Sequence, residues 1–392
     1  MKNHNINYDI EKIAALISID LKKRAMYYDE NPQFQTKNFD LIKEKGFLKI
    51  AIPKMMGGLG ASLSSIIKAQ IKIAQGDAST ALGIGMHTIV CGFESENHLW
   101  PKQKRDFIFK DIASNSTLIN NIASEAELGS PKSGGRPQTK IFKDKDNLLR
   151  LKGKKNWATI STGLDHLIVY AYNNDSRRLC RVIVNSHNER IQINKQWNGI
   201  GMRSTESHEI IFNSVKINKT DILYEHGQSK KHTKLPFNAW FPLIIGATSL
   251  GIAIEARNQL IKYLNNRQPT GYKKPVSTIP FIKHELGRID TKIMTNNNFL
   301  NSVAAEWEKK NNNKDNLIPY IIAAKREATE AAVYITDSVM RLVGGIGLEK
   351  ENQFERFFRD ARSGLINPPI EARALETIAE HALQHPDNKF LI

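Results

Sequence analysis

Cysteine is scarce in this chain, and a long uninterrupted apolar run is missing. Of 392 residues only Cys91 and Cys180 are cysteines, which excludes a disulfide framework and a multi-cysteine metal site. The first residues hold no apolar core of signal-peptide type. The most apolar stretch, 240–256, is broken by Pro242 and Glu255 and is too short and too polar to cross a bilayer. These absences predict a cytoplasmic protein without membrane insertion.

Blocks of like charge are also missing, although the net charge is high. Lys and Arg number 56 against 40 Asp and Glu, which gives +16. Because the basic residues are dispersed and not interleaved with aromatics, nucleic-acid binding is not expected. A field of this sign favours phosphorylated small ligands instead. The GxSxG, CxxC and Walker patterns are absent, so nothing indicates a hydrolase, a metal site or an NTPase.

Hydrophobic periodicity divides the chain into three parts. In residues 1–116 apolar side chains recur at three- and four-residue steps, which is typical of amphipathic helices. Residues 117–224 carry short runs rich in Ile, Val and Leu between turn residues, which indicates strands. Helical periodicity returns in 225–392. The sequence therefore predicts an α+β chain with a helical domain, a β domain and a second helical domain.

Seven short motifs follow one another over about 320 residues on this plan. They are the Gly- and Pro-containing loop 46–60, ASEAELGS at 123–130, GKKNWAT at 153–159, GMRST at 201–205, Arg267 with Gly271, GGIG at 344–347 and RDAR at 359–362. In this order they resemble the acyl-CoA dehydrogenase family. The resemblance implies a middle β-barrel or sandwich, a C-terminal four-helix bundle and a homotetramer that holds flavin adenine dinucleotide (FAD).

The same resemblance assigns residues to the ring half of the flavin. Ser124, Gly129 and Ser130 offer hydroxyls and close backbone to the ring edge and the pyrophosphate. Trp157 supplies a flat apolar surface for the isoalloxazine ring. Thr159 is placed to hydrogen-bond near the reactive nitrogen of that ring.

Other residues are assigned to the adenosine half and to the partners. Arg267 is expected to bind the pyrophosphate of a neighbouring subunit through a charge-assisted contact. Gly344 and Gly345 let the backbone approach the adenosine. The implied substrate is an acyl-CoA, and the implied electron acceptor is a protein such as an electron-transfer flavoprotein.

The chain departs from the family at the catalytic base. Dehydrogenation needs a carboxylate that removes a proton beside the thioester carbonyl. In most members this is a Glu about eight or nine residues after the start of the RDA motif. Counting from Arg359 reaches Pro368, which has neither a carboxylate nor a backbone N–H. The base position of other members falls here near Trp240 and Phe241, which are not acids.

Three explanations remain open. Glu371, one helical turn past Pro368, is a candidate replacement base, although a first-turn Glu also stabilises a helix N-terminus. Alternatively, the chain resembles flavin-dependent monooxygenases of this fold, which use flavin mononucleotide (FMN) from a flavin reductase and need no such base. The candidate residues are then Ser161, Asn367 and His87. The third explanation is a flavoprotein of altered chemistry.

Overall fold

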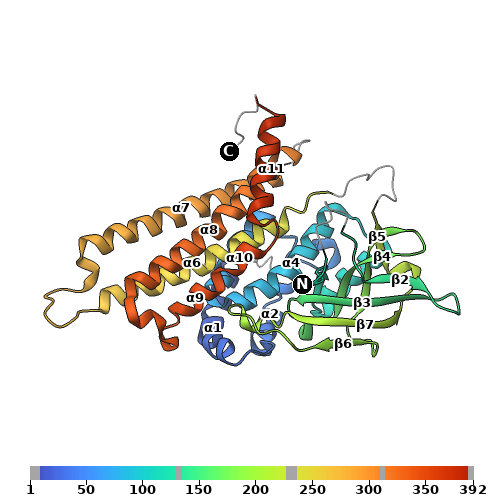
Figure 1. Cartoon of the computed structure of the whole chain (residues 1–392), viewed down its shortest axis with the longest axis horizontal. Coiled ribbons are helices and arrows are strands. Elements are labelled where there is room, and N and C mark those ends of the chain that lie inside the picture. Colours follow the sequence, from blue (N-terminus) through green and yellow to red (C-terminus); the bar gives the residue numbers. More distant parts are fainter. Residues whose placement is uncertain (1–8, 129–134, 227–235, 310–313, 387–392) are drawn as a thin grey trace, which may run out of the picture.

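The structure is a computed structural model that describes residues 9–128, 135–226, 236–309 and 314–386. Figure 1 shows the long C-terminal helices at one end of the molecule, the sheet at the other, and N-terminal helices between them. The predicted succession of a helical, a β and a second helical domain is confirmed. Gly129 and Ser130, expected at the flavin, lie outside the described residues.

Five α-helices form most of the described N-terminal part. They are α1 (Ile10–Glu30), α2 (Thr36–Glu44), α3 (Leu63–Gly76), α4 (Ala78–Asn97) and α5 (Lys102–Asn115). Asp77 separates α3 from α4, and its carboxylate accepts the Thr80 N–H at 2.7 Å as an N-cap. Almost every side chain in the first four turns of α4 is buried. The small residues of this segment therefore make it a central helix.

The middle part is one mixed eight-stranded sheet. Its strands are β1 (Ile119–Ile122), β2 (Lys140–Lys143), β3 (Leu149–Ala158), β4 (His166–Asn173), β5 (Arg178–Asn185), β6 (Ile191–Asn194), β7 (His208–Lys216) and β8 (Ile222–Glu225). The order is β6-β7-β3-β2-β4-β5-β8. Two short strands, β1 and β2, pair in parallel with successive parts of β4. This arrangement brings the end of β1 beside β3.

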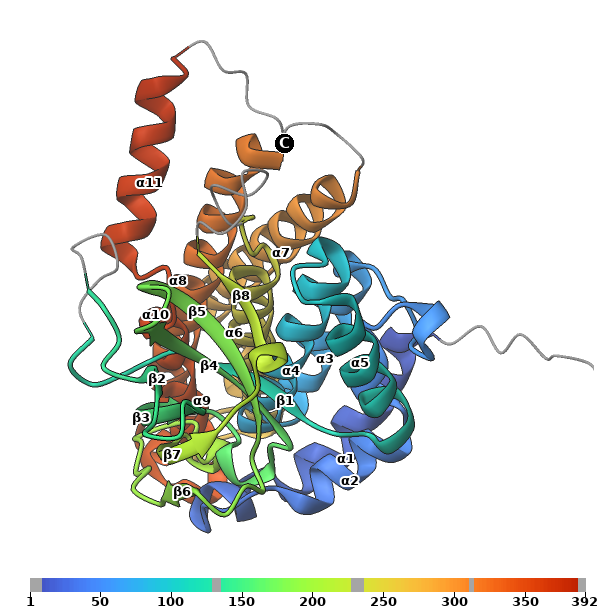
Figure 2. The ribbon, with the colours of Figure 1, turned by 90° about the vertical axis from the view of Figure 1, so that its right-hand side faces the viewer.

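The C-terminal part contains α6 (Trp240–Asn266), α7 (Pro280–Glu308), α8 (Ile318–Val343), α9 (Phe354–Ala361), α10 (Ser363–Ile366) and α11 (Glu371–Gln384). The three long helices α6, α7 and α8 pack on one another, and α3 packs on α6. Figure 2 shows α11 projecting away from them. By length and composition alone, Lys314–Leu348 is apolar enough to cross a membrane. In the structure this stretch supplies α8, a helix of the bundle.

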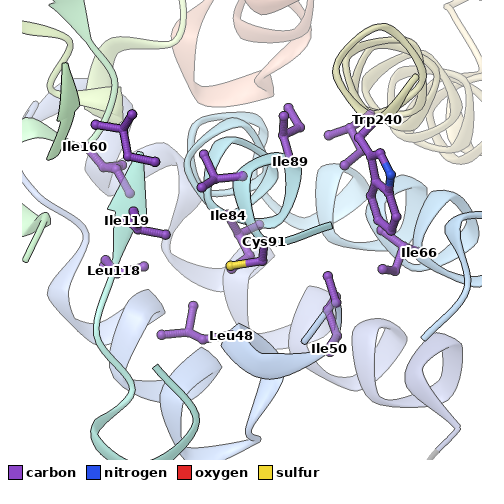
Figure 3. Packing of buried hydrophobic residues seen from close by; sticks show 14 of the residues in the cluster. Leu48, Ile50, Ile66, Ile84, Ile89, Cys91, Leu118, Ile119, Ile160 and Trp240 are labelled. Atoms are coloured by element: carbon purple, nitrogen blue, oxygen red, sulfur yellow. The ribbon is translucent and has the colours of Figure 1, made fainter. Parts of the chain in front are cut away.

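One hydrophobic core joins the three parts. Figure 3 shows Ile84 and Cys91 of α4, Ile119 of β1 and Trp240 of α6 around the same region. A Cβ atom on Gly92 would lie 2.3 Å from the Trp240 ring, so only glycine allows α4 and α6 to come this close. The helices α4 and α6 and the strand β1 are thus fixed relative to one another, and residues of all three line one cavity.

Candidate active site

A cavity of about 1020 Å³ lies between the sheet and the C-terminal helices. Its volume is at the upper limit of ordinary ligand pockets, about 300–1,000 Å³, which leaves room for more than one ligand group. The sheet, the first turn of α6, the start of α8 and the turn after α10 form its walls. Lining side chains include Asn120, Ser124, Asn156, Trp157, Thr159, Phe241, Pro242, Ile318, Ile322, Asn367, Pro368 and Pro369.

Trp157 dominates the sheet wall. Its φ of 56° is in the left-handed region, an outlier for so bulky a residue, next to a register shift between β3 and β7. The indole is 56% exposed although it lies at the end of a strand. A strained backbone that turns a large aromatic face into a cavity is suited to covering a flat ring such as the isoalloxazine.

Polar contacts fix the neighbours of Trp157. The Thr159 hydroxyl accepts a hydrogen bond from Ser207 at 3.4 Å, and the Thr159 carbonyl accepts one from Asn120 at 3.2 Å. The Ser124 carbonyl accepts the Asn156 N–H at 3.0 Å. Since Ser207 donates to it, the Thr159 hydroxyl can still donate its own proton. The structure therefore brings Ser124, Trp157 and Thr159 together at one cavity. Their chemistry fits the ring half of a flavin, and their binding of it stays a prediction.

The opposite wall is the turn that replaces the usual catalytic Glu. Pro368 lies in this wall and offers no carboxylate. Beneath it, the buried Lys325 amine donates to the carbonyls of Asn367 at 2.8 Å and Pro369 at 3.2 Å. Burial lowers the pKa of Lys325 to about 8. The Asn367 amide donates to the Ser363 carbonyl at 2.8 Å. This wall is thus a well-fixed turn without an acid.

The structure does not bring Glu371 to the cavity. Its side chain is 56% exposed and binds Arg326 of α8 at 2.7 Å. Among the described residues that line the cavity, the carboxylates are instead Asp315 and Glu380. Glu380 lies on α11 one turn after Thr377, which also lines the cavity. Sequence reasoning missed both acids, because their distance from the RDA motif matches no family position.

Two further candidates from the monooxygenase reading are also kept away from the cavity by their partners. Ser161 is 1% exposed, and its hydroxyl donates to the Glu206 carbonyl at 2.7 Å. His87 is completely buried. Its Nε2 lies 2.7 Å from the Leu48 carbonyl, and its Nδ1 accepts the Ile119 N–H at 3.2 Å. The Ser161 hydroxyl and both ring nitrogens of His87 thus have hydrogen-bond partners inside the protein. Of the three candidates, only Asn367 lines the cavity.

His87 should make the fold sensitive to mild acid. The two contacts require a neutral ring, and burial lowers the pKa of His87 from 6.5 to about 4. A depressed histidine pKa stabilises the fold above pH 6.5, and this contribution is lost as the pH falls toward 4. We expect the loss of this contribution to lower the free energy of unfolding by at most about 3 kcal/mol, since each pKa unit corresponds to about 1.4 kcal/mol. Denaturant unfolding of His87→Gln should show a smaller fall over this range than the wild type.

A control separates this effect from general acid sensitivity. His284 is largely exposed, so His284→Gln should retain the pH dependence of the wild type. An equal pH dependence in His87→Gln and the wild type would show that His87 does not stay neutral in the fold.

The residues expected at the adenosine half lie at the other end of the bundle. Arg267 follows α6, whose first turn lines the cavity, so about 40 Å of helix separates the two. Gly344 follows α8 at the same end, where the Tyr263 hydroxyl donates to the Val343 carbonyl at 3.4 Å. Its φ of 70° favours glycine, and space is open where Cβ atoms of Gly344 and Gly345 would lie. Within one chain these residues cannot meet the ring half.

Solved structures of both enzyme types share this fold. Butyryl-CoA dehydrogenase from Megasphaera elsdenii superposes with a TM-score of 0.85 at 20% identity, covering 98% of this chain and 99% of that one. FMN-bound TdsC, a dibenzothiophene monooxygenase from Paenibacillus sp. A11-2, also gives 0.85 at 20% identity, with 96% and 97% covered. Both likenesses concern the fold alone.

Sequence comparison identifies the family. Residues 10–114 match the family described as "Acyl-CoA dehydrogenase, N-terminal domain", and residues 242–383 match "Acyl-CoA dehydrogenase, C-terminal domain". The Bacillus subtilis YdbM protein, named as an acyl-CoA dehydrogenase, is 30% identical over 375 residues, 96% of each chain. The short/branched chain specific enzyme of Rattus norvegicus is 26% identical, over 95% of this chain and 82% of its own length. The chain therefore belongs to the acyl-CoA dehydrogenase family of FAD-dependent oxidoreductases.

Proposed function

We propose that the protein catalyses the α,β-dehydrogenation of an acyl-CoA-like thioester, with a base at an unusual position. The observation that carries this proposal is the cavity of about 1020 Å³ between Trp157 and the turn at Pro368. It has room for a flavin ring and a substrate side by side. Its walls combine apolar side chains with polar ones in nearly equal numbers, and ligand sites generally contain both kinds.

The residues of the chain would divide the work as follows. Ser124, Trp157 and Thr159 would hold and cover the flavin ring, which when bound accepts the hydride from the β-carbon of the substrate. A carboxylate must take the α-proton. A candidate base is judged first by whether it can reach this proton and only then by its pKa. We assign this role to Glu380, with Asp315 as the second choice, because these acids line the cavity. Glu371, engaged by Arg326, does not.

Monooxygenation is the alternative, and Asn367 is the observation that favours it. Asn367 lies in the cavity wall without a neighbouring acid at Pro368, as a base-free reaction would allow. This reading would use FMN delivered by a flavin reductase. The support for monooxygenation is weaker, because Ser161 and His87 form hydrogen bonds with backbone carbonyls inside the protein. Arg267 and the Gly344–Gly345 turn also suit a dinucleotide rather than FMN.

Anaerobic titration tests the proposal. The purified protein should carry FAD, and saturated acyl-CoAs of suitable chain length should bleach it. Retention of the visible flavin absorbance with every acyl-CoA, together with oxygen consumption on addition of reduced FMN and an aromatic substrate, would favour the monooxygenase.

The assembly is proposed to be a homotetramer. Arg267 lies too far from the cavity of its own chain to share one cofactor with Trp157, so a second subunit is needed to complete the site. The projecting helix α11 also leaves Leu375 47% and Leu383 82% exposed, which suits burial by another copy. A cytoplasmic location and an electron-transfer flavoprotein as acceptor complete the proposal.

A further inference from the structure

A second cavity, of about 230 Å³, adjoins the first. The two have six lining residues in common: Met86, Asn120, Asn121, Pro236, Asn238 and Phe241. The smaller cavity lies between α4, the N-terminal end of α6 and the sheet, where Figure 2 shows β5 and β8. Its other walls are mainly apolar, and they include Ile89, Val90, Phe93, Trp100 and Ile168. It is placed to receive the far end of a molecule bound in the larger cavity.

Arg181 of β5 is the charged residue in this apolar wall. Its Nε and Nη1 atoms are buried and have no hydrogen-bond partner among the described residues. The guanidinium stacks on Tyr170, with its carbon 3.9 Å from the ring centroid. Tyr224 lines the same cavity as Arg181. Burial lowers the pKa of Arg181 from its usual value, but arginine stays charged at neutral pH.

Acids of the neighbouring elements are already bound elsewhere. Glu125 pairs with Lys155 at 2.6 Å. Glu94 accepts two backbone N–H groups at the end of α4 and lies 3.5 Å from Arg105. Glu225 accepts hydrogen bonds from two polar side chains near the end of β4. In the described part of the chain, Arg181 therefore forms no ion pair.

Arg181 is half-buried as a residue, but its Nε and Nη1 atoms are buried without a partner. Leaving such donors unpaired is costly, and stacking on one aromatic ring offsets only part of that cost. Two unused N–H groups of a guanidinium that lines a cavity suit an oxyanion, which arginine binds through parallel hydrogen bonds. We propose that Arg181 binds a terminal carboxylate on the acyl chain of the substrate. The preferred substrate is then a thioester of a dicarboxylic acid. This inference rests on the proposed function, since it names the substrate class of the same site.

The size and lining of the smaller cavity favour the end of an acyl chain, rather than a coenzyme phosphate, as the group that Arg181 binds. A volume of about 230 Å³ equals that of about eight water molecules at ~30 Å³ each, enough for a carboxylate and a few methylene groups. Apolar walls favour methylene groups. The other polar residues of the described lining, Tyr224 and three asparagines, are neutral, so Arg181 is its single cation, which suits a singly charged carboxylate better than a doubly charged phosphate.

Binding of two matched ligands tests the proposal. Adipoyl-CoA and hexanoyl-CoA have six-carbon acyl chains and differ in the terminal carboxylate. Calorimetry with the flavin-loaded protein should show adipoyl-CoA bound about 10- to 100-fold more tightly by the wild type, the usual effect of a charge-assisted contact. In Arg181→Met this preference should disappear, while hexanoyl-CoA binds as before. Arg178→Met, an exposed position on the same strand, should keep the preference.

Three further measurements distinguish the proposed role of Arg181 from misfolding of the variant and from binding of a coenzyme phosphate. The melting temperature of Arg181→Met should not fall, because the substitution removes two buried nitrogen donors that have no partner among the described residues. If the variant nevertheless fails to fold, Tyr224→Phe should reduce the preference several-fold. Coenzyme A alone should bind the wild type and Arg181→Met equally. A loss of coenzyme A affinity in the variant would assign Arg181 to a phosphate and overturn the proposal.

The outcomes also separate this inference from the proposed function. Bleaching of the flavin by hexanoyl-CoA without any preference for adipoyl-CoA would leave dehydrogenation standing and overturn the role of Arg181. A clear preference in binding without bleaching would support the role of Arg181 and contradict dehydrogenation. If neither thioester binds, both proposals fail.

Discussion

Replacing Glu380 with Gln is expected to slow the bleaching of bound FAD by an acyl-CoA about 10²- to 10⁴-fold, as the loss of a positioned base usually does. Glu380 lines the cavity from α11, the helix that follows the turn at Pro368. The substitution keeps size and hydrogen bonding but removes the proton acceptor. Stopped-flow measurement of flavin absorbance under anaerobic conditions gives the rate, and the saturation curve gives the affinity, which should change little.

Two matched variants locate the base. Glu371→Gln changes an acid on the same helix that lies outside the cavity and binds Arg326, so its rate should equal that of the wild type. Asp315→Asn tests the other acid in the cavity wall. A rate loss in Asp315→Asn with none in Glu380→Gln would move the assignment to Asp315. Unchanged rates in both would remove the carboxylate base from the proposal.

Pro368→Glu provides a gain-of-function complement to these losses. It would restore a carboxylate at the usual family position, in a wall that already faces the cavity. An increased bleaching rate would show that the unusual base works less well than the usual one.

Several residues that form a motif lie together at the cavity. Trp157 and Thr159 of the GKKNWAT motif line it, and so does Pro368, the position reached by counting from Arg359. Their contact with a flavin stays a prediction. Local sequence determines such positions because a strand end or a short turn fixes its own backbone. The spacing of the motifs along the chain was therefore sufficient to single out these residues.

Residues whose role depends on distant partners could not be placed in this way. His87 is held by a carbonyl 39 positions away, Ser161 by one 45 positions away, and Glu371 by an arginine 45 positions away. No periodicity reports such contacts. Each of these side chains is polar, and Ser161 and Glu371 also lie near a motif, so the sequence made all three candidates. The tertiary contacts show which are already engaged.

Short and mixed segments were the other source of omissions. The strands β2, β6 and β8 have four residues each, too few for a period of two to stand out. Arg181 carries a signal in the sequence, since it interrupts the short apolar run CRVIV at 180–184 within the predicted β domain. A charge inside such a run indicates either a solvent-facing position or a ligand. The structure excludes the first for its Nε and Nη1 atoms, which are buried.

Arg267→Ala is expected to lower the affinity of the apoprotein for FAD by about 10- to 100-fold and to leave the affinity for FMN unchanged. A hydrogen bond to a charged group contributes about 1.5–3 kcal/mol, which corresponds to this range. Arg267 is exposed at the end of α6 farthest from the cavity, beside the Gly344 turn. It can therefore reach only the adenosine diphosphate half, which FMN lacks. Fluorescence titration with each flavin measures both affinities.

A control variant and the oligomeric state of the protein determine how the effect of Arg267→Ala on flavin affinity is interpreted. Lys262→Ala removes an exposed charge one turn earlier on α6 and should change neither affinity. An equal loss of FAD and FMN binding in Arg267→Ala would contradict the assignment, because damage to the fold or to the ring site affects both flavins alike. The separation of about 40 Å between Arg267 and the cavity further requires that FAD bridge two subunits. Light scattering of the FAD-loaded wild type should therefore give a tetramer or at least a dimer, and a monomer that retains FAD tightly would exclude a role for Arg267 in trans.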